Sequence, residues 1–176
     1  MEVGPRDGLQ SEKKIVPTAL KIDIISGLAA AGVRMIQVGA FVSPRRVPQM
    51  ADTDRLPALL EPVAGVTYNY LVLNRNGFDR ALRSGAGSVE ISASASDTHS
   101  RKNTGIPGAK AIGEAVKMMG SAKAGGIHVR ASVQCVFGCA YEGGIDPEFV
   151  LAIARSFIAG GPDMLVLADT TGMATP

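Results

Sequence analysis

The residues best suited to chemistry in this chain are polar side chains that come directly after short apolar runs. Near the N-terminus, Arg6 and Asp7 place a fixed cation next to a carboxylate. Further along, the polar residues at the ends of such runs are Gln37, Asn74, Ser94, Asp97, Gln134, Asp169 and Thr170. If the runs are parallel strands, these side chains collect at one rim of the sheet, which is where a β/α barrel builds its active site. The alternative is that Arg6 and Asp7 only form a polar turn.

The cysteines and histidines match no common metal or redox motif. Cys135 and Cys139 are separated by three residues, which fits neither a zinc knuckle nor a redox C-x-x-C motif. We expect them to be reduced side chains that pack or line a site. His128 begins a predicted strand, so it should point away from the rim. His99 lies in the predicted loop after the fourth strand and is a candidate for substrate contact, with a purely structural role as the alternative.

A repeating order of elements positions these residues: an amphipathic stretch, a small-residue turn and an apolar run that ends in polar residues. The apolar spacing predicts helices over residues 17–31, 54–60, 77–84, 109–124 and 147–159. Strands are predicted over residues 2–3, 35–38, 67–73, 89–92, 127–134 and 164–168. Glycines follow four of the helices, and left-handed C-caps are expected at Gly32, Gly85, Gly125 and Gly160.

Strands separated by helices imply parallel pairing with right-handed crossovers, so the fold is an open doubly wound sheet or a TIM (β/α)8 barrel. The order of elements alone favours neither. No glycine-rich nucleotide-binding motif opens a helix, which weakens the open sheet. The polar residues at successive strand ends favour an incomplete TIM barrel of about six βα units, with one domain over residues 1–176.

Composition excludes several classes of protein. Hydrophobic residues make up 46% and charged residues 19% of the 176 residues, as in a globular domain and unlike a disordered chain. A formal charge of +2 without a long run of Lys or Arg does not indicate a nucleic-acid-binding protein. No apolar window is long enough to span a membrane, and the N-terminus resembles neither a signal nor a transit peptide. We therefore expect a soluble cytoplasmic protein.

Several motifs occur in the order found in one family of enzymes. They are Gly4-Pro5-Arg6-Asp7-Gly8-Leu9-Gln10, Phe41-Val42-Ser43-Pro44, Val47-Pro48-Gln49-Met50-Ala51-Asp52, Arg101-Lys102-Asn103, Cys135-x-x-Gly138-Cys139-x-Tyr141-Glu142-Gly143 and Asp169-Thr170-x-Gly172. With them, the chain resembles the 3-hydroxy-3-methylglutaryl-CoA lyase family over nearly its whole length. Isopropylmalate, citramalate and homocitrate synthases share the Arg-Asp-Gly core, but the residues flanking this core are similar to the lyases.

The resemblance implies a metal-dependent retro-Claisen cleavage of a 3-hydroxyacyl-CoA to acetyl-CoA and acetoacetate, a reaction of leucine degradation. It makes Asp7 a ligand of Mg2+ or Mn2+, since carboxylate oxygens suit hard cations. It makes Arg6 the cation that stabilises the departing enolate. Arg6 and Gln37 are then the catalytic residues, and the substrate-binding residues are Arg6, Gln10, Asn103, Asp169 and Thr170. An acyl-CoA substrate and a homo-oligomer are also implied.

Three features depart from the family's pattern. Gln37 stands where the family has a glutamate, so this side chain can accept a hydrogen bond from Arg6 but cannot act as a base. The His-x-His metal ligands and the later catalytic cysteine of the family are missing from the sequence. A barrel takes about 250 residues, so we expect a piece of a longer protein that is inactive alone. The alternatives are an attenuated lyase, a lyase for another substrate, a related aldolase or acyl-CoA synthase, and a non-catalytic remnant.

Overall fold

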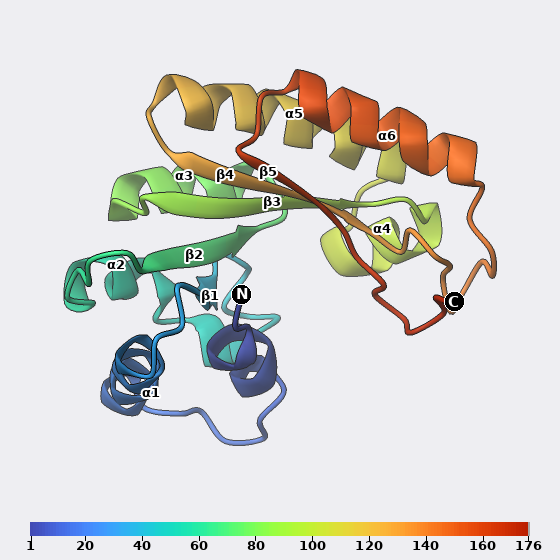
Figure 1. The fold of residues 1–176 in the computed structure, drawn as a ribbon. Coiled ribbons are helices and arrows are strands. Elements are labelled where there is room, and N and C mark those ends of the chain that lie inside the picture. The colour runs from blue at the N-terminus through green and yellow to red at the C-terminus, as the bar shows by residue number, and fades with distance from the viewer. Residues whose placement is uncertain (176) are drawn as a thin grey trace. The chain divides into compact units, whose positions relative to one another are not determined.

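The computed structural model describes residues 1–175, which form strands alternating with helices (Figure 1). These residues divide into two compact units. Unit 1 contains Met1–Val72 and Asn76–Val89, and unit 2 contains Leu73–Arg75 and the chain from Glu90 onward. The strand β3 (Ser88–Ser94) begins in unit 1 and continues in unit 2. That residues 1–176 fold as one domain stays a prediction.

Unit 1 is built from the N-terminal elements. In chain order they are η1 (Gly4–Gly8), α1 (Thr18–Ala30), β1 (Met35–Ala40), η2 (Pro48–Met50), η3 (Thr53–Arg55), α2 (Leu56–Leu59), β2 (Thr67–Val72), most of α3 (Arg75–Ser84) and the start of β3. The predicted helices and strands of this part are confirmed to within a few residues, except for the first strand predicted over residues 2–3. The predicted helix over residues 54–60 is a 3-10 turn, η3, that continues as the short α2.

In unit 1, β1 pairs both with β2 and with Glu2 near the N-terminus. β1 and β2 pair in parallel, and their register places Gln37 opposite Asn69. Glu2 joins β1 as a parallel bridge, and its carbonyl accepts the Gln37 N–H at 2.8 Å. The predicted first strand is therefore a single bridge, because Gly4 and Pro5 turn the chain into η1 directly after it.

Unit 2 carries the later elements. In chain order they are the rest of β3, α4 (Asp97–Thr104), α5 (Gly108–Ala124), β4 (His128–Gln134), α6 (Pro147–Ala159) and β5 (Met164–Leu167). β3 lies beside β4, where the Ser92 hydroxyl donates to the Ser132 carbonyl at 3.3 Å. β4 pairs in parallel with β5, starting at Arg130↔Met164. Figure 1 shows α5 and α6 side by side, and both helices contact β4.

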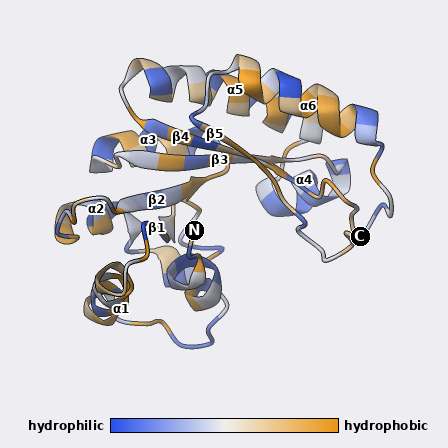
Figure 2. Cartoon of the chain, in the orientation of Figure 1, coloured by the Kyte–Doolittle hydropathy of each residue, from blue (hydrophilic) through white to orange (hydrophobic). Residues whose placement is uncertain are grey.

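Apolar side chains fill both units. β3 is buried along its whole length, as is typical of a parallel strand covered on both faces. The buried residues of α5 recur at helical spacing and are Gly108, Ala111, Ala115, Met118, Met119 and Ala122. Figure 2 shows hydrophobic residues along α5 and α6, whereas α4 is mostly hydrophilic. Within residues 1–175, no helix combines the length and the apolar character that crossing a membrane requires.

The order of the strands decides between the two candidate folds. It runs β1-β2-β3-β4-β5 without a reversal, the first part within unit 1 and the rest within unit 2. An open doubly wound sheet reverses its order at a switch point, whereas a barrel adds each strand beside the previous one. The parallel five-stranded sheet with alternating helices is thus that of a partial TIM barrel, with one strand fewer than the sequence predicted.

The prediction of a loop after β3 is wrong, because residues Asp97–Thr104 form the helix α4. The helix begins after Ser96, whose side chain accepts the His99 N–H, and ends at Gly105 with φ 84°. An ion pair between Asp97 and Arg101, 2.6 Å apart, supports the helix along one face. Residues 97–104 contain no large apolar side chain, so a search for apolar periodicity does not detect them.

The predicted glycine C-caps are half right. Gly32 and Gly85 are left-handed, with φ of 90° and 78°. Gly125 and Gly160 have φ of −85° and −70°, so they continue the helical turn. In both cases a second glycine follows and takes the left-handed conformation, at Gly126 and Gly161.

An ion pair links β3 and β4, and we expect it to contribute to the stability of the fold. Arg130 Nε lies 2.9 Å from Glu90 Oε2, and the two side chains are 15% and 10% exposed. Removing one partner leaves a charge with little access to water. The experiments refer to the full-length protein, meaning the protein as its cell produces it. In this protein, Glu90→Gln is expected to lower the free energy of unfolding by about 3 kcal/mol, measured by urea denaturation.

The matched control is Glu114→Gln on α5. Its carboxylate lies 3.9 Å from Lys110 Nζ at the surface, so the loss should stay below about 0.5 kcal/mol. Equal losses in the two variants would contradict a special role for the Glu90–Arg130 pair.

Candidate active site

Four of the residues predicted to do chemistry lie together in unit 1. Arg6 Nε donates to Gln37 Oε1 at 2.6 Å, and Arg6 Nη1 lies 2.7 Å from Asp7 Oδ1. Gln10 Nε2 donates to the same Asp7 oxygen at 3.2 Å. The guanidinium is therefore held by a neutral amide on one side and by a carboxylate on the other.

The turn η1 gives Arg6 and Asp7 different surroundings. The backbone N–H groups of both residues donate to the Val3 carbonyl, at 3.0 and 2.7 Å, and Pro5 supplies a fixed φ at the start of the turn. The Arg6 side chain is only 15% exposed, whereas the Asp7 side chain is 57% exposed. An ion pair this open to water adds little stability. The Asp7 carboxylate also stays accessible to a ligand.

Behind Gln37 lie two residues that the sequence analysis missed. Gln37 Nε2 donates to Asn69 Oδ1 at 3.3 Å, and Asn69 Nδ2 donates to Ser88 Oγ at 2.9 Å. All three side chains are at most 2% exposed. The available signal was a polar residue inside the apolar run of β2. Its partner follows from the register of β1 and β2, which the sequence does not show.

In unit 2, two predicted substrate-binding residues follow β5, and their side chains accept hydrogen bonds from backbone N–H groups. Asp169 accepts the N–H groups of Met173 and Ala174, at 2.9 and 3.1 Å. The Thr170 hydroxyl accepts the Cys135 N–H at 2.8 Å. Asn103 lies exposed on α4. That Asn103, Asp169 and Thr170 contact a substrate stays a prediction.

His99 lies on α4, in half-buried surroundings. Its Nδ1 atom is buried and has no hydrogen-bond partner within the described part of the chain. Burial lowers the pKa of His99, and the nearby Glu142 carboxylate opposes that shift. The imidazole is therefore biased towards its neutral form. A small polar pocket at this place is lined by His99, Lys102, Asn103 and Tyr141.

The two cysteines are free and buried. Cys135 follows β4 directly and has φ 58°, a conformation that non-glycine residues rarely adopt. Burial raises the pKa of the Cys135 thiol. Burial also disfavours the Cys139 thiolate, but hydrogen bonds from Ser96 and from the N–H groups of Tyr141 and Glu142 outweigh it and lower the pKa of Cys139.

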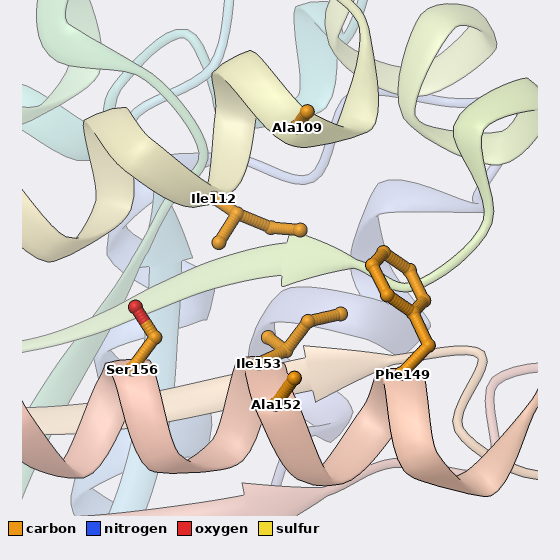
Figure 3. Close-up of a pocket in the computed structure, with 6 residues that line it drawn as sticks. All are labelled: Ala109, Ile112, Phe149, Ala152, Ile153 and Ser156. Carbon is orange, nitrogen blue, oxygen red and sulfur yellow. The ribbon is translucent and has the colours of Figure 1, made fainter.

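An apolar groove runs between α5 and α6. Its lining residues, drawn in Figure 3, are Ala109, Ile112, Phe149, Ala152, Ile153 and Ser156. The Phe149 side chain is 46% exposed, whereas Ile153 is 3% exposed and belongs to the core. None of the lining residues is titratable, so this groove is not suited to acid–base chemistry.

A complete metal site is not formed by residues 1–175, which contain no group of three or more His, Cys, Asp or Glu placed to hold one ion. Asp7 has the oxygen chemistry that Mg2+ or Mn2+ requires, and its carboxylate is accessible. It therefore fits as one ligand, and further ligands are needed for a tight site.

The family of the chain is decided by a match over its whole length. The HMGL-like family matches residues 1–176. The chain belongs to this family. It is 40% identical to the mitochondrial hydroxymethylglutaryl-CoA lyase of Rattus norvegicus over 176 residues, which are 100% of this chain and 54% of the rat protein. The HMGL-like chain thus spans about half the length of the curated relatives it matches, which include mitochondrial and cytoplasmic lyases.

Solved structures agree with this assignment. The hydroxymethylglutaryl-CoA lyase of Pseudomonas aeruginosa superposes with a TM-score of 0.90 at 40% identity, covering 99% of this chain and 58% of the other. An HMG-CoA lyase of Acinetobacter baumannii, in complex with coenzyme A and 3-methylmalate, gives a TM-score of 0.93 at 34% identity, covering 99% and 57%. The predicted resemblance to these lyases is confirmed.

Proposed function

We propose that the full-length protein is a carbon–carbon lyase that cleaves a 3-hydroxyacyl-CoA, with 3-hydroxy-3-methylglutaryl-CoA as the reference substrate. The products would be acetyl-CoA and acetoacetate. The observation that carries this proposal is the fixed guanidinium of Arg6, held at 2.6 Å by Gln37 beside the accessible Asp7. Membership of the HMGL-like family supports the reaction class.

Arg6 has the properties that the cleavage step requires. When the carbon–carbon bond breaks, the acetyl-CoA fragment leaves as an enolate, and negative charge develops on its thioester oxygen. A cation whose direction is set before the reaction stabilises that charge without reorganisation. Arg6 is such a cation, since its Nε and Nη1 atoms are both engaged and its side chain is mostly buried.

Gln37 cannot take up the proton of the substrate hydroxyl, because a glutamine amide is not a base at neutral pH. Its contribution would be to orient Arg6. The hydroxyl proton must therefore pass to another group or to water. This feature favours, as the second candidate, a lyase that acts on a different 3-hydroxyacyl-CoA.

Asp7 would provide one carboxylate ligand for Mg2+ or Mn2+. A divalent ion bound there would lower the pKa of the substrate's tertiary hydroxyl. The contribution of this chain is an exposed carboxylate whose Oδ1 atom is oriented by Arg6 and Gln10, at 2.7 and 3.2 Å.

The substrate and the setting of the reaction belong to the same proposal. An acyl-CoA substrate is supported by the coenzyme A complex of the Acinetobacter baumannii lyase. Gln10, Asn103, Asp169 and Thr170 would contact this substrate. A homo-oligomeric protein that acts in the cytoplasm, within leucine degradation, completes the proposal.

The direct test is an assay of the full-length protein with Mn2+ and a panel of 3-hydroxyacyl-CoA thioesters, in which release of acetyl-CoA is measured. The same protein is also supplied with acetyl-CoA and 2-oxo acids, because consumption of acetyl-CoA would identify a synthase. Cleavage of at least one thioester is expected. Activity in neither direction would overturn the proposal and favour a non-catalytic protein.

Gln37→Glu separates the two candidate lyases. If 3-hydroxy-3-methylglutaryl-CoA is the natural substrate, a carboxylate beside Arg6 is expected to raise kcat by roughly tenfold or more, because a general base is restored. If another thioester is the natural substrate, its cleavage should fall while 3-hydroxy-3-methylglutaryl-CoA stays a poor substrate. Gln37→Leu, which removes the hydrogen bond to Arg6 without adding a base, is the control and should lower activity in either case.

A further inference from the structure

A line of buried, uncharged side chains extends from Arg6 into the interior of unit 1. The successive hydrogen bonds are Arg6 to Gln37 at 2.6 Å, Gln37 to Asn69 at 3.3 Å and Asn69 to Ser88 at 2.9 Å. Gln37 and Asn69 have no exposed surface, and Ser88 is 2% exposed. All four residues belong to the same compact unit.

The direction of this line is determined by its first member. An arginine only donates hydrogen bonds, so Gln37 must present its carbonyl oxygen to Arg6. The Gln37 amide nitrogen then faces Asn69 and requires an acceptor, which Asn69 supplies as Oδ1. The Asn69 nitrogen in turn faces the Ser88 hydroxyl oxygen. If either amide were rotated by half a turn, two donors or two acceptors would face each other in a buried place.

Local backbone structure holds the two amides opposite each other. Gln37 and Asn69 are direct partners in the parallel pairing of β1 and β2, and the register shifts immediately afterwards, between Gln37 and Gly39. The Gln37 backbone N–H is also bonded to the Glu2 carbonyl at 2.8 Å. The strand positions of both residues are thus defined independently of their side chains.

We propose that Asn69 and Ser88 are positioning residues for the reaction: they hold the Gln37 amide in the orientation that receives Arg6 Nε, and so set the direction of the guanidinium. This inference rests on the proposed function only in the claim that Arg6 acts on the substrate. Neither residue touches Arg6 itself in these hydrogen bonds. Their effect on Arg6 passes through Gln37. Mutation of Gln37 can therefore separate this effect from a purely structural role of Asn69 or Ser88.

The first experiment compares Asn69→Leu with Asn69→Asp in the full-length protein at pH 8. Leucine has a similar size but no acceptor for the Gln37 nitrogen, whereas an aspartate retains one. Asn69→Leu is expected to lower kcat by roughly five- to tenfold with little change in KM, and Asn69→Asp to restore most of it. Ser92→Ala is the matched control, since Ser92 is a buried serine of the same strand as Ser88 that bonds to a backbone carbonyl.

A double-mutant cycle tests whether Asn69 acts through Gln37. In a Gln37→Leu background, Asn69→Leu is expected to cause no further loss of kcat, because the group it orients is already absent. A purely structural role of Asn69 predicts the same loss in both backgrounds. That result would overturn the proposal.

A third measurement does not depend on lyase activity. In protein labelled with 15N-arginine, the Arg6 Nε–H should exchange slowly with solvent in the wild type and in Asn69→Asp, and faster in Asn69→Leu. Unchanged exchange in Asn69→Leu would overturn the positioning role even if the enzyme is active. Changed exchange in a protein without lyase activity would uphold the positioning and reject the proposed function. If Asn69→Leu fails to fold, Ser88→Ala replaces it, with an expected change in the same direction and the same outcome that overturns the proposal.

Discussion

Arg6→Ala in the full-length protein is expected to lower kcat for thioester cleavage by roughly two to three orders of magnitude and to leave Mn2+ affinity nearly unchanged. Under the proposed function, the guanidinium would meet its strongest partner, the enolate oxygen, only in the transition state. In the free protein it donates to Gln37 and Asp7, and these contacts do not require a metal. Steady-state kinetics and Mn2+ titration of the same preparation give the two quantities.

Two controls separate this effect from a loss of structure. Arg155→Ala removes an exposed arginine of α6 and should leave kcat within about twofold of the wild type. Arg6→Lys keeps the charge but loses the planar fork that holds Gln37 and Asp7 together, so it should recover only part of the lost rate. An Arg6→Ala protein as active as the wild type would remove the catalytic assignment of Arg6.

Asp7→Ala is expected to weaken Mn2+ binding by more than about a hundredfold, because the proposed divalent site would lose a charged oxygen ligand. The measurement is the decrease of the free Mn2+ signal in electron paramagnetic resonance, which requires no turnover. Asp23→Ala, which removes an exposed carboxylate on α1, is the control and should leave the binding curve unchanged. Wild-type affinity in Asp7→Ala would place the metal ligands elsewhere in the protein.

Together the two variants assign separate roles to neighbouring residues. Loss of turnover without loss of Mn2+ in Arg6→Ala, and loss of Mn2+ in Asp7→Ala, would support the proposed division between enolate stabilisation and metal binding. Loss of Mn2+ in both variants would instead indicate that the contact between Arg6 and Asp7, at 2.7 Å, orients the carboxylate for the ion.

The order of helices and strands could be predicted from the sequence because it depends on local patterns. Apolar spacing located α5 and α6 to within one residue at each end. The polar residues that follow apolar runs favoured the barrel, and the strand order confirmed it. The resemblance to the lyases also implied that Gln37 could accept a hydrogen bond from Arg6, and the structure contains this bond at 2.6 Å.

The tertiary structure alone decided which residues support that contact. Asn69 and Ser88 stand 32 and 51 positions after Gln37, and their hydrogen bonds arise from strand register and not from sequence spacing. The same is true of Thr170, which receives the Cys135 N–H across 35 positions. Local composition determined the elements and the chemical types at their ends. Long-range pairing determined the direction in which each buried polar group points, because such a group must find its partner among residues that the fold brings near.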